Sequence, residues 1–548
     1  MGSEASYERG SAPPVHRRGR PTDRGPGSRH PGQAPGPEVP LATVRETFNL
    51  AVALVDAHLE AGRGDRPAIR SSGETLSYAA VAGRVNRAGN ALRALGVEPE
   101  QRVALILPDS PDFVAAFLGA IKVGAVPVTL STLLTPFDQA VLIDDSRARV
   151  LVVHETLAPA LEAQRAQLRQ LRHVLVAGGA RSSFAAAVAG ASDELEPEPT
   201  RPDDMCFWQY SSGTTGRPKA VVHLQQSALA PAELHGRHVV AMRPDDRVFS
   251  VAKLFFSYGL NNSLVIPFRH GALTILESAR PEPATVFETI ARERPTVFYG
   301  VPTSYGAMLA HGGEPDTSSI RVYVSAGEAL PKPLFQRWKA RFGQEILDGI
   351  GSTEIGYIAI SNFAGRARPG TSGEVIPGYE AKVVDGEGQR LPPGEIGDLL
   401  VRGPSTALGY WNNRAATKRT FRGEWVFTGD RYSVDAEGYH MYQGRSDDLL
   451  KVGGIWVSPL EVETALLEHD AVLECAVVAR EDSDGLVKPS AYVVLREGGA
   501  PSQGLAGELR AFVKDRLAPY KYPRWIEFVP ELPKTSTGKI QRFKLRAR

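Results

Sequence analysis

The sequence between residues 76 and 178 alternates between two kinds of apolar pattern. Residues 76–97 space their apolar side chains three and four apart, as the buried face of a helix requires. Residues 102–108 and 125–130 are short, continuous apolar runs of the kind found in buried strands, and residues 109–124 between them begin with Asp and Ser, which cap helices. This strand–helix–strand order predicts an α/β fold with helix-covered, largely parallel sheets.

Further strands are expected at residues 149–154 and 172–178, which keeps the same alternation going. Between residues 371 and 410 turn residues become closely spaced among short apolar runs, which favours a small β subdomain. The last hundred residues combine strands at 474–481 and 489–495 with a helix at 505–517, which predicts a small α+β domain.

We place the domain boundary next to Arg445, where the charged run "GRSDD" follows the predicted subdomain. The resulting division is a tail over residues 1–40, a large N-terminal domain over 41–445 and a C-terminal domain over 446–548. The tail is rich in Pro, Gly, Arg and Ser and lacks the apolar residues needed to form a core, so we expect it to be disordered.

Composition excludes several classes of partner. The 63 Lys and Arg residues balance 62 Asp and Glu residues, so the chain lacks the basic excess typical of proteins that bind nucleic acid or an anionic membrane. No apolar run approaches the ~20 residues of a membrane helix. Cys206 and Cys475 stand alone, which argues against disulfides and structural zinc and favours the cytoplasm.

The stretch "YSSGTTGRPKAVVH", Tyr210–His223, has the Ser, Thr, Gly and Lys content of a phosphate-binding loop. It is not a Walker A loop. When its first Gly is placed at Gly213, Pro218 falls where the second Gly belongs and Ala220 where a Mg²⁺-binding hydroxyl belongs. The remaining interpretations are a loop whose hydroxyls and N–H groups follow a polyphosphate, with Lys219 adding charge, and a polar hairpin turn.

The whole stretch resembles the phosphate-binding signature of the adenylate-forming (ANL) superfamily. Four later segments resemble other motifs of that superfamily, and they occur in its usual order: "DGIGSTE" (348–354), "WVFTGD" (425–430), "YQGRSDDLLKVGG" (442–454) and "PKTSTGK" (533–539). The resemblance implies ATP, Mg²⁺ and a thiol acceptor. It also implies a C-terminal domain that moves between two half-reactions about a hinge at Asp447.

The same resemblance assigns roles to individual residues. It makes Lys539 the adenylation lysine, Glu354 with Thr214 the Mg²⁺ ligands, and Lys219 and Thr353 further catalytic groups. His223 and His440 remain structural in this interpretation, and Tyr410 and Trp411 are packing residues. The residues implied for the nucleotide and the thiol are Ser211, Ser212, Gly213, Thr214, Thr215, Gly216, Gly327, Glu328, Asp348, Gly349, Ile350, Gly351, Ser352, Asp430, Tyr442, Arg445, Gly453 and Gly454.

The acid substrate is suggested by residues 250–268, 298–309 and 325–331, which resemble the benzoate–CoA ligase branch and its flat slot for an aromatic ring. The implied slot residues are Ser257, Tyr258, Gly259, Ala326 and Tyr357. Two of them depart from that branch, where Ala usually stands at Ser257 and many members have His at Tyr357. Because both departures add a hydroxyl, we expect a hydroxy- or aminobenzoate in preference to benzoate.

The activity expected is therefore that of an AMP-forming aryl-CoA ligase, which converts an aromatic acid to an acyl-adenylate and transfers it to CoA. One alternative is an aryl-acid ligase that loads the phosphopantetheine of a carrier protein, since both acceptors are thiols. A second alternative is a non-catalytic nucleotide-binding sensor, against which the complete set of Glu354, Asp430 and Lys539 argues.

Overall fold

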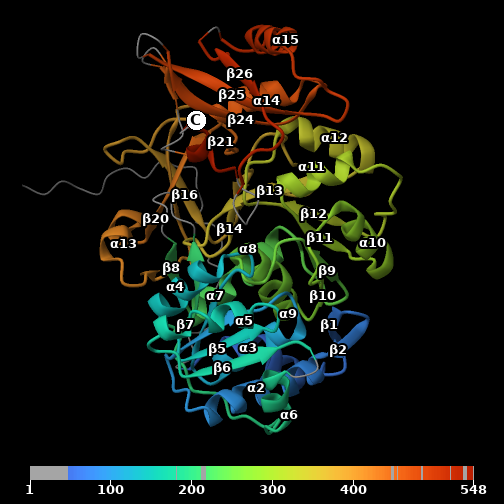
Figure 1. Cartoon of the computed structure of the whole chain (residues 1–548), viewed down its shortest axis with the longest axis vertical. Coiled ribbons are helices and arrows are strands. Elements are labelled where there is room, and N and C mark those ends of the chain that lie inside the picture. The colour runs from blue at the N-terminus through green and yellow to red at the C-terminus, as the bar shows by residue number, and fades with distance from the viewer. Residues whose placement is uncertain are drawn as a thin grey trace, which may run out of the picture. The chain divides into compact units, whose positions relative to one another are not determined.

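The computed structural model describes residues 47–179, 182–211, 218–445, 450–452, 455–482, 486–518, 520–534 and 540–546. The predicted tail and the predicted hinge Asp447 lie outside these residues. Within them the chain forms two large sheets and three smaller ones (Figure 1).

The first large sheet has seven strands in the order β18-β8-β7-β4-β3-β5-β6, and its strands β7, β4, β3, β5 and β6 run parallel. The antiparallel strands β8 and β18 extend it at one edge. The strands are β3 (Arg102–Ile106), β4 (Val126–Thr129), β5 (Val150–His154), β6 (His173–Ala177), β7 (Met205–Ser211), β8 (Lys219–Leu224) and β18 (Gly409–Tyr410).

The second large sheet has nine strands in the order β15-β14-β13-β12-β11-β9-β10-β1-β2. Its central strands are parallel, and antiparallel strands close both edges. The strands are β1 (Pro67–Ser71), β2 (Glu74–Ser77), β9 (Arg247–Ser250), β10 (Leu273–Leu276), β11 (Val297–Gly300), β12 (Val322–Ser325), β13 (Ile346–Gly351), β14 (Ile358–Ser361) and β15 (Glu374–Val375).

Helices cover these sheets and connect their parallel strands. Helix α3 begins at Pro111 because Ser110 caps it by accepting the N–H of Phe113, and α2 begins after the similar cap Ser77. The two helices pack against each other (Figure 1). The helices are α1 (Ala57–Glu60), α2 (Tyr78–Ala94), α3 (Pro111–Lys122), α4 (Pro136–Ser146), α5 (Ala158–Glu162), α6 (Ser183–Ala189), α7 (Gln225–Pro231), α8 (Ser257–Leu260), α9 (Ile266–His270), α10 (Pro283–Glu293), α11 (Pro302–Ala310), α12 (Lys332–Phe342) and α13 (Arg414–Thr420). Shorter π or 3₁₀ turns are η1 (Val52–Asp56), η2 (Arg165–Gln167), η3 (Ala232–Gly236) and η4 (Asn261–Val265).

Strands of the second sheet bury both faces. Successive residues point to opposite sides of a strand, so Val248 joins the hydrophobic core that also contains Val103 of the first sheet. Phe249 and Phe298 join a separate core with Trp338 of α12 on the other side. The continuous apolar strand runs seen in the sequence follow from this two-sided burial.

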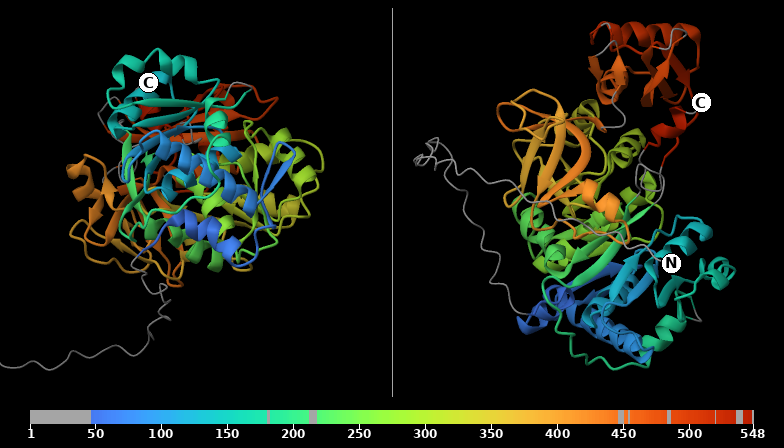
Figure 2. Two further views of the ribbon diagram at one scale, coloured as in Figure 1. Left: turned by 90° about the horizontal axis from the view of Figure 1, so that it is seen from below. Right: turned by 90° about the vertical axis from the view of Figure 1, so that its left-hand side faces the viewer.

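The remaining elements form a five-stranded sheet and a C-terminal group. The five strands are β16 (Glu380–Val384), β17 (Gly397–Arg402), β19 (Phe421–Arg422), β20 (Trp425–Val434) and β21 (His440–Arg445). The C-terminal group, red in Figure 2, contains β22 (Leu450–Val452), β23 (Ile455–Val457), α14 (Pro459–Leu467), β24 (Val472–Glu481), β25 (Val487–Leu495), α15 (Gln503–Lys514), β26 (Trp525–Phe528) and α16 (Arg542–Arg546).

This architecture confirms the predicted α/β class with helix-covered, largely parallel sheets. The β subdomain, however, differs from the prediction of residues 371–410. Its sheet continues to Arg445, and Gly409–Tyr410 pairs instead with β8 of the first sheet. The domain boundary predicted next to residue 445 adjoins residues 446–449, which lie outside the described part of the chain, and stays a prediction.

Candidate active site

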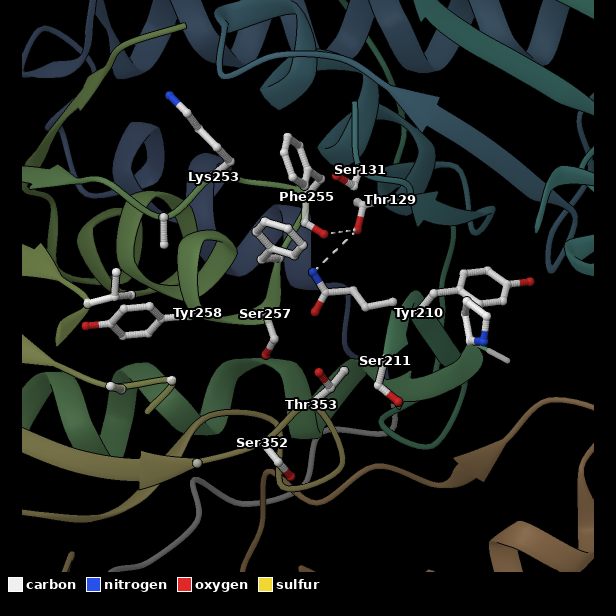
Figure 3. Close-up of a pocket in the computed structure, with 18 of the residues that line it drawn as sticks. Thr129, Ser131, Tyr210, Ser211, Lys253, Phe255, Ser257, Tyr258, Ser352 and Thr353 are labelled. Carbon is white, nitrogen blue, oxygen red and sulfur yellow. Dashed lines mark hydrogen bonds between the residues drawn. The ribbon is translucent and has the colours of Figure 1, made fainter. Parts of the chain in front are cut away.

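A cavity of about 1240 Å³ lies beside the carboxyl ends of β4, β9, β11, β12 and β13. Parallel strands end at a common edge, which is where α/β proteins place their ligands. In the view of Figure 3, Tyr258 and Ser211 lie on opposite sides of the cavity, with Ser257 and Thr353 between them. The cavity therefore has two ends, and we describe each in turn.

The first end is formed by the hairpin of β7 and β8. Ser211 is the last residue of β7 and Lys219 the first of β8, and the two are register partners that both line the cavity. The loop that joins them contains Ser212, Gly213, Thr214, Thr215 and Gly216, which lie outside the described residues. The described part of the hairpin thus brings a hydroxyl and an ammonium group to the cavity, as a phosphate site requires.

Glu354 meets this hairpin from the second sheet. The Ser211 hydroxyl donates to Oε1 of Glu354 at 2.9 Å, and the hydroxyl of Tyr410 donates to the same oxygen at 2.9 Å. Ser352 and Thr353, which precede Glu354 after the end of β13, also line the cavity. The structure therefore gathers three residues predicted as catalytic, Lys219, Thr353 and Glu354, around one end of the cavity.

The predicted nucleotide-binding residues before Ser352 differ in whether they line the cavity. Gly351 lines the cavity, and a Cβ there would lie 2.2 Å from the Tyr357 carbonyl oxygen, so only glycine fits. Asp348 is instead buried below the cavity wall, where its Oδ2 accepts the N–H of Leu330 at 3.3 Å. Asp348, Gly349 and Ile350 are not among the residues that line the cavity. The structure thus gives Asp348 a supporting position, whereas the sequence predicted a contact with the nucleotide.

A third group lies along β20 and β21. Arg445 pairs with Asp430 at 2.9 Å and donates to the carbonyl of Thr428 at 3.1 Å. Arg445, Thr428 and Gly429 line the cavity, whereas Asp430 and Tyr442 do not. Asp430, one of the residues implied for the nucleotide, is therefore held by Arg445 directly beside the cavity wall. Two further predicted residues, Gly327 and Glu328, follow β12. Gly327 lines the cavity and has a φ of +94°, whereas Glu328 does not line it.

The other end of the cavity is the predicted ring slot. Ser257, Tyr258, Ala326 and Tyr357 all line it. The rings of Tyr258 and Tyr357 are stacked with centroids 6.0 Å apart, and the Tyr258 hydroxyl donates to the carbonyl of Gly300 at 3.1 Å. Gly259 faces away from the cavity, because a Cβ there would lie 2.0 Å from the Lys253 carbonyl oxygen.

The two hydroxyls expected to read a ring substituent have partners within the protein. The Ser257 hydroxyl donates to the carbonyl of Gly356 at 2.8 Å, and the Tyr357 hydroxyl donates to Oδ1 of Asn262. Tyr357 is 2 % exposed, and its ring edge also meets His235. Both donors are used to fix the walls of the slot, which leaves each hydroxyl only its acceptor lone pairs for a ring substituent and weakens the expectation of a hydroxy- or aminobenzoate.

The remaining predicted residues belong to the C-terminal part. Gly453, Gly454 and Lys539 lie outside the described residues. Lys534 and Ile540, which are described, form an isolated antiparallel bridge. Arg542 follows, and its guanidinium makes two hydrogen bonds of 2.9 and 2.8 Å to the buried carboxylate of Glu463.

Sequence reasoning missed two residues of this site. Tyr410 was interpreted as a packing residue, yet its hydroxyl donates a hydrogen bond to Glu354. The sequence did not reveal this because the two-residue strand β18 cannot be recognised in a region rich in turns. Asn262, which binds Tyr357, is fully buried in η4 within a segment that reads as a continuous apolar helix apart from its polar pair Asn261–Asn262. That polar pair was the available signal.

Comparison with known proteins agrees with this geometry. The profile of the AMP-binding enzyme family matches residues 56–411, and that of the AMP-binding enzyme C-terminal domain matches residues 461–539. The chain belongs to the AMP-binding enzyme family, in its benzoate–CoA ligase-like branch, as the motifs predicted.

Its similarity to individual members covers nearly the whole chain. It is 50 % identical to a benzoate–CoA ligase of Thauera aromatica over 93 % of this chain and 97 % of that protein. It is 45 % identical to a 4-hydroxybenzoate–CoA/benzoate–CoA ligase of Rhodopseudomonas palustris over 91 % and 94 % of the two chains. The structure of the anthranilate CoA ligase AuaEII with anthranoyl-AMP matches with a TM-score of 0.89 and 43 % identity, covering 92 % of this chain and 98 % of that one.

Two features are absent from the part of the chain that the structure describes. No helix there is long and apolar enough to cross a membrane. The same residues contain no cluster of three or more His, Cys, Asp or Glu side chains that could hold a metal ion.

The buried Asp348 makes the stability of the protein depend on pH. Burial raises the pKa of its carboxyl from 3.8 to about 8. Between these values the folded protein binds a proton that the unfolded chain releases, so the free energy of unfolding falls as pH rises through this window. Asp348→Asn keeps an acceptor for the Leu330 N–H and cannot ionise. We expect its melting temperature, relative to wild type, to rise between pH 5 and pH 8.

A control for this prediction is Asp193→Asn, which changes an aspartate whose side chain is 60 % exposed. Its melting temperature relative to wild type should stay constant over the same range. A constant difference for Asp348→Asn as well would show that this carboxyl does not titrate with folding.

Proposed function

We propose that the protein activates an aromatic carboxylic acid with ATP and then transfers the aryl group to CoA. The observation that supports this most is the continuity of one cavity from the group of Ser211, Lys219 and Glu354 to the slot of Tyr258 and Tyr357. A substrate carboxylate held between the two ends would meet the α-phosphate of ATP. Relatives along nearly the full chain are named as benzoate–CoA and hydroxybenzoate–CoA ligases.

In the first half-reaction a carboxylate oxygen attacks the α-phosphorus, an acyl-adenylate forms and pyrophosphate leaves. No proton is transferred, so the task of the protein is to position the reactants and neutralise charge. Lys219 supplies positive charge and the Thr353 hydroxyl a donor at the phosphate end, where the Ser211 hydroxyl holds Glu354. Lys539 is proposed to bridge the carboxylate and the α-phosphate.

Glu354 suits Mg²⁺ bound to a nucleotide. Mg²⁺ on a nucleotide usually takes one or two protein carboxylates and completes its shell with phosphate and water oxygens, which agrees with the place of Glu354 beside Ser211 and Lys219. Oε1 of Glu354 accepts hydrogen bonds from two hydroxyl groups, and its Oε2 accepts no hydrogen bond from a described residue. A bound Mg²⁺ would neutralise phosphate charge, and Thr214 is the second ligand that the resemblance implies.

In the second half-reaction a thiolate attacks the carbonyl carbon of the adenylate, and AMP leaves with the bonding electrons. The glycines Gly453 and Gly454 are proposed to line the path of the pantetheine arm, and Asp447 to act as the hinge that brings them there. CoA is the acceptor favoured by the relatives, of which several are named CoA ligases. A carrier-protein thiol is the alternative, because CoA and a carrier protein both present the thiol of a pantetheine arm.

For the acid itself, the engaged hydroxyls of the slot change the expectation from the sequence. Because Ser257 and Tyr357 donate to protein acceptors, the slot presents mainly ring faces and Ala326 to the substrate. We therefore propose benzoate as the preferred acid. Pyrophosphate release with benzoate, 2-aminobenzoate, 3-hydroxybenzoate and 4-hydroxybenzoate tests this, and no release with any of them would support the nucleotide sensor instead.

The division of labour between half-reactions gives a second prediction. Lys539→Ala should lower the rate of adenylate formation by about 10²–10³-fold, because one preorganised positive charge is lost. The same variant should convert supplied benzoyl-adenylate to thioester at nearly the rate of wild type. Equal losses of rate in both half-reactions would contradict the proposed role of Lys539. The assay of thioester formation should compare CoA with a phosphopantetheinylated carrier protein as the acceptor.

The slot hydroxyls give a third prediction. Ser257→Ala and Tyr357→Phe should lower kcat/KM for benzoate and for hydroxybenzoates by similar factors, because each loss releases a wall of the slot. Tyr357→Phe also strands the buried Oδ1 of Asn262 at a cost of about 1–3 kcal/mol, whereas the Gly356 carbonyl keeps Asn261 as a donor after Ser257→Ala. The ratio of kcat/KM between the acids is the quantity to measure. A selective loss for a hydroxy- or aminobenzoate would restore the interpretation made from the sequence.

A further inference from the structure

Tyr410 is the residue in which the two large sheets and the phosphate end of the cavity come together. Strand β18 pairs with β8, so that Tyr410 is the register partner of Val221. The N–H of Tyr410 donates to the hydroxyl of Thr417 at 3.1 Å, and its ring packs edge-on against Phe421. The main chain and the ring are therefore held independently of anything that the hydroxyl does.

The tyrosine hydroxyl is aimed at Glu354. It donates to Oε1 at 2.9 Å, and the Ser211 hydroxyl donates to the same oxygen from the end of β7 at the same distance. The two donors reach the carboxylate from separate strands. A carboxylate that accepts two such bonds on one oxygen loses its freedom to rotate, and its other oxygen is directed away from both donors.

The ring of the same tyrosine contacts the candidate phosphate lysine. Lys219 Nζ lies 5.1 Å from the ring centroid, a distance at which an ammonium group is attracted to an aromatic face.

We propose that Tyr410 is a positioning residue for the nucleotide-bound divalent cation. Its hydroxyl donates a hydrogen bond to Oε1 of Glu354 and thereby leaves Oε2 facing the cation. Its ring contacts Lys219 and orients the ammonium group toward the phosphates. Tyr410 does not itself touch the reacting atoms. The inference rests on the proposed function only for the identity of the ligand, a divalent cation bound to a nucleoside triphosphate.

The test measures cation binding rather than catalysis. The full-length protein is saturated with α,β-methylene-ATP, in which the bond to the leaving pyrophosphate cannot be cleaved, and is titrated with Mn²⁺ while free Mn²⁺ is followed by electron paramagnetic resonance. Tyr410→Phe removes one hydroxyl and keeps the ring. We expect the dissociation constant for Mn²⁺ to rise about two- to tenfold, the size of effect expected from one ordinary hydrogen bond that acts on the cation through Glu354.

A matched control is Tyr439→Phe. The Tyr439 hydroxyl donates to the carbonyl of Arg366 at 3.1 Å, and this residue does not line the cavity. Its substitution should leave Mn²⁺ affinity unchanged. Glu354→Gln should weaken Mn²⁺ binding more strongly than Tyr410→Phe, which verifies that the assay reports on this carboxylate.

Three outcomes decide the proposal. Weaker Mn²⁺ binding by Tyr410→Phe, with a melting temperature near that of wild type, supports it. Unchanged Mn²⁺ affinity in Tyr410→Phe combined with weak binding in Glu354→Gln overturns it and leaves Tyr410 a packing residue. Failure of the wild type to release pyrophosphate with any aromatic acid would overturn the proposed function alone, because the Mn²⁺ titration contains no acid.

Discussion

Two-sided burial of the central strands is the constraint on which the site depends. Val248 and Phe249 are neighbours in β9, yet they belong to different hydrophobic cores on opposite faces of the sheet. A strand shifted by one residue would exchange its two faces and lose both cores. The register of the parallel strands is therefore fixed, and so is the line along which their carboxyl ends open into the cavity. Residues just beyond those ends, such as Gly327 and Glu354, need little further support to lie near one another.

Within that frame the phosphate end collects few full charges and many neutral donors. Glu354 and Lys219 are the charged groups on the described part of the hairpin and its partner segment, and the hydroxyls of Ser211 and Tyr410 fill the space between them. Neutral donors fix a carboxylate without cancelling its charge. A lysine at either hydroxyl position would instead form an ion pair with Glu354 and compete with a cation for it.

Much of this arrangement could be predicted from the chain. The helix and strand periods of residues 76–178 identified the fold class, and short motifs identified Ser211, Lys219 and Glu354, because these features are local in sequence. Tyr410 could not be predicted, since its strand has two residues and its partner strand β8 is distant in the chain. Asp348 shows the opposite error. It lies within a motif predicted to bind nucleotide, but the alternation of a strand turns its side chain into the protein interior.

The hydroxyls of the ring slot show where a sequence stops being informative. The residue types of Ser257 and Tyr357 show that each position carries a hydroxyl donor, but they do not show which group accepts its hydrogen bond. The acceptors are the Gly356 carbonyl and the Asn262 side chain. An acceptor supplied by the main chain leaves no trace in the sequence, and Asn262 becomes informative only once η4 is known to face Tyr357.

The bond between Ser257 and Gly356 also has a meaning for protein engineering. Gly356 follows Glu354 by two residues on the same turn, and Asn261 donates to the Gly356 carbonyl as well. The wall of the ring slot and Glu354, the proposed metal carboxylate, are therefore parts of one short, braced segment. A redesign that widens the slot for bulkier acids by moving α8 will also shift Glu354. Substrate range and nucleotide affinity should consequently change together, and directed evolution of one will have to include compensating changes for the other.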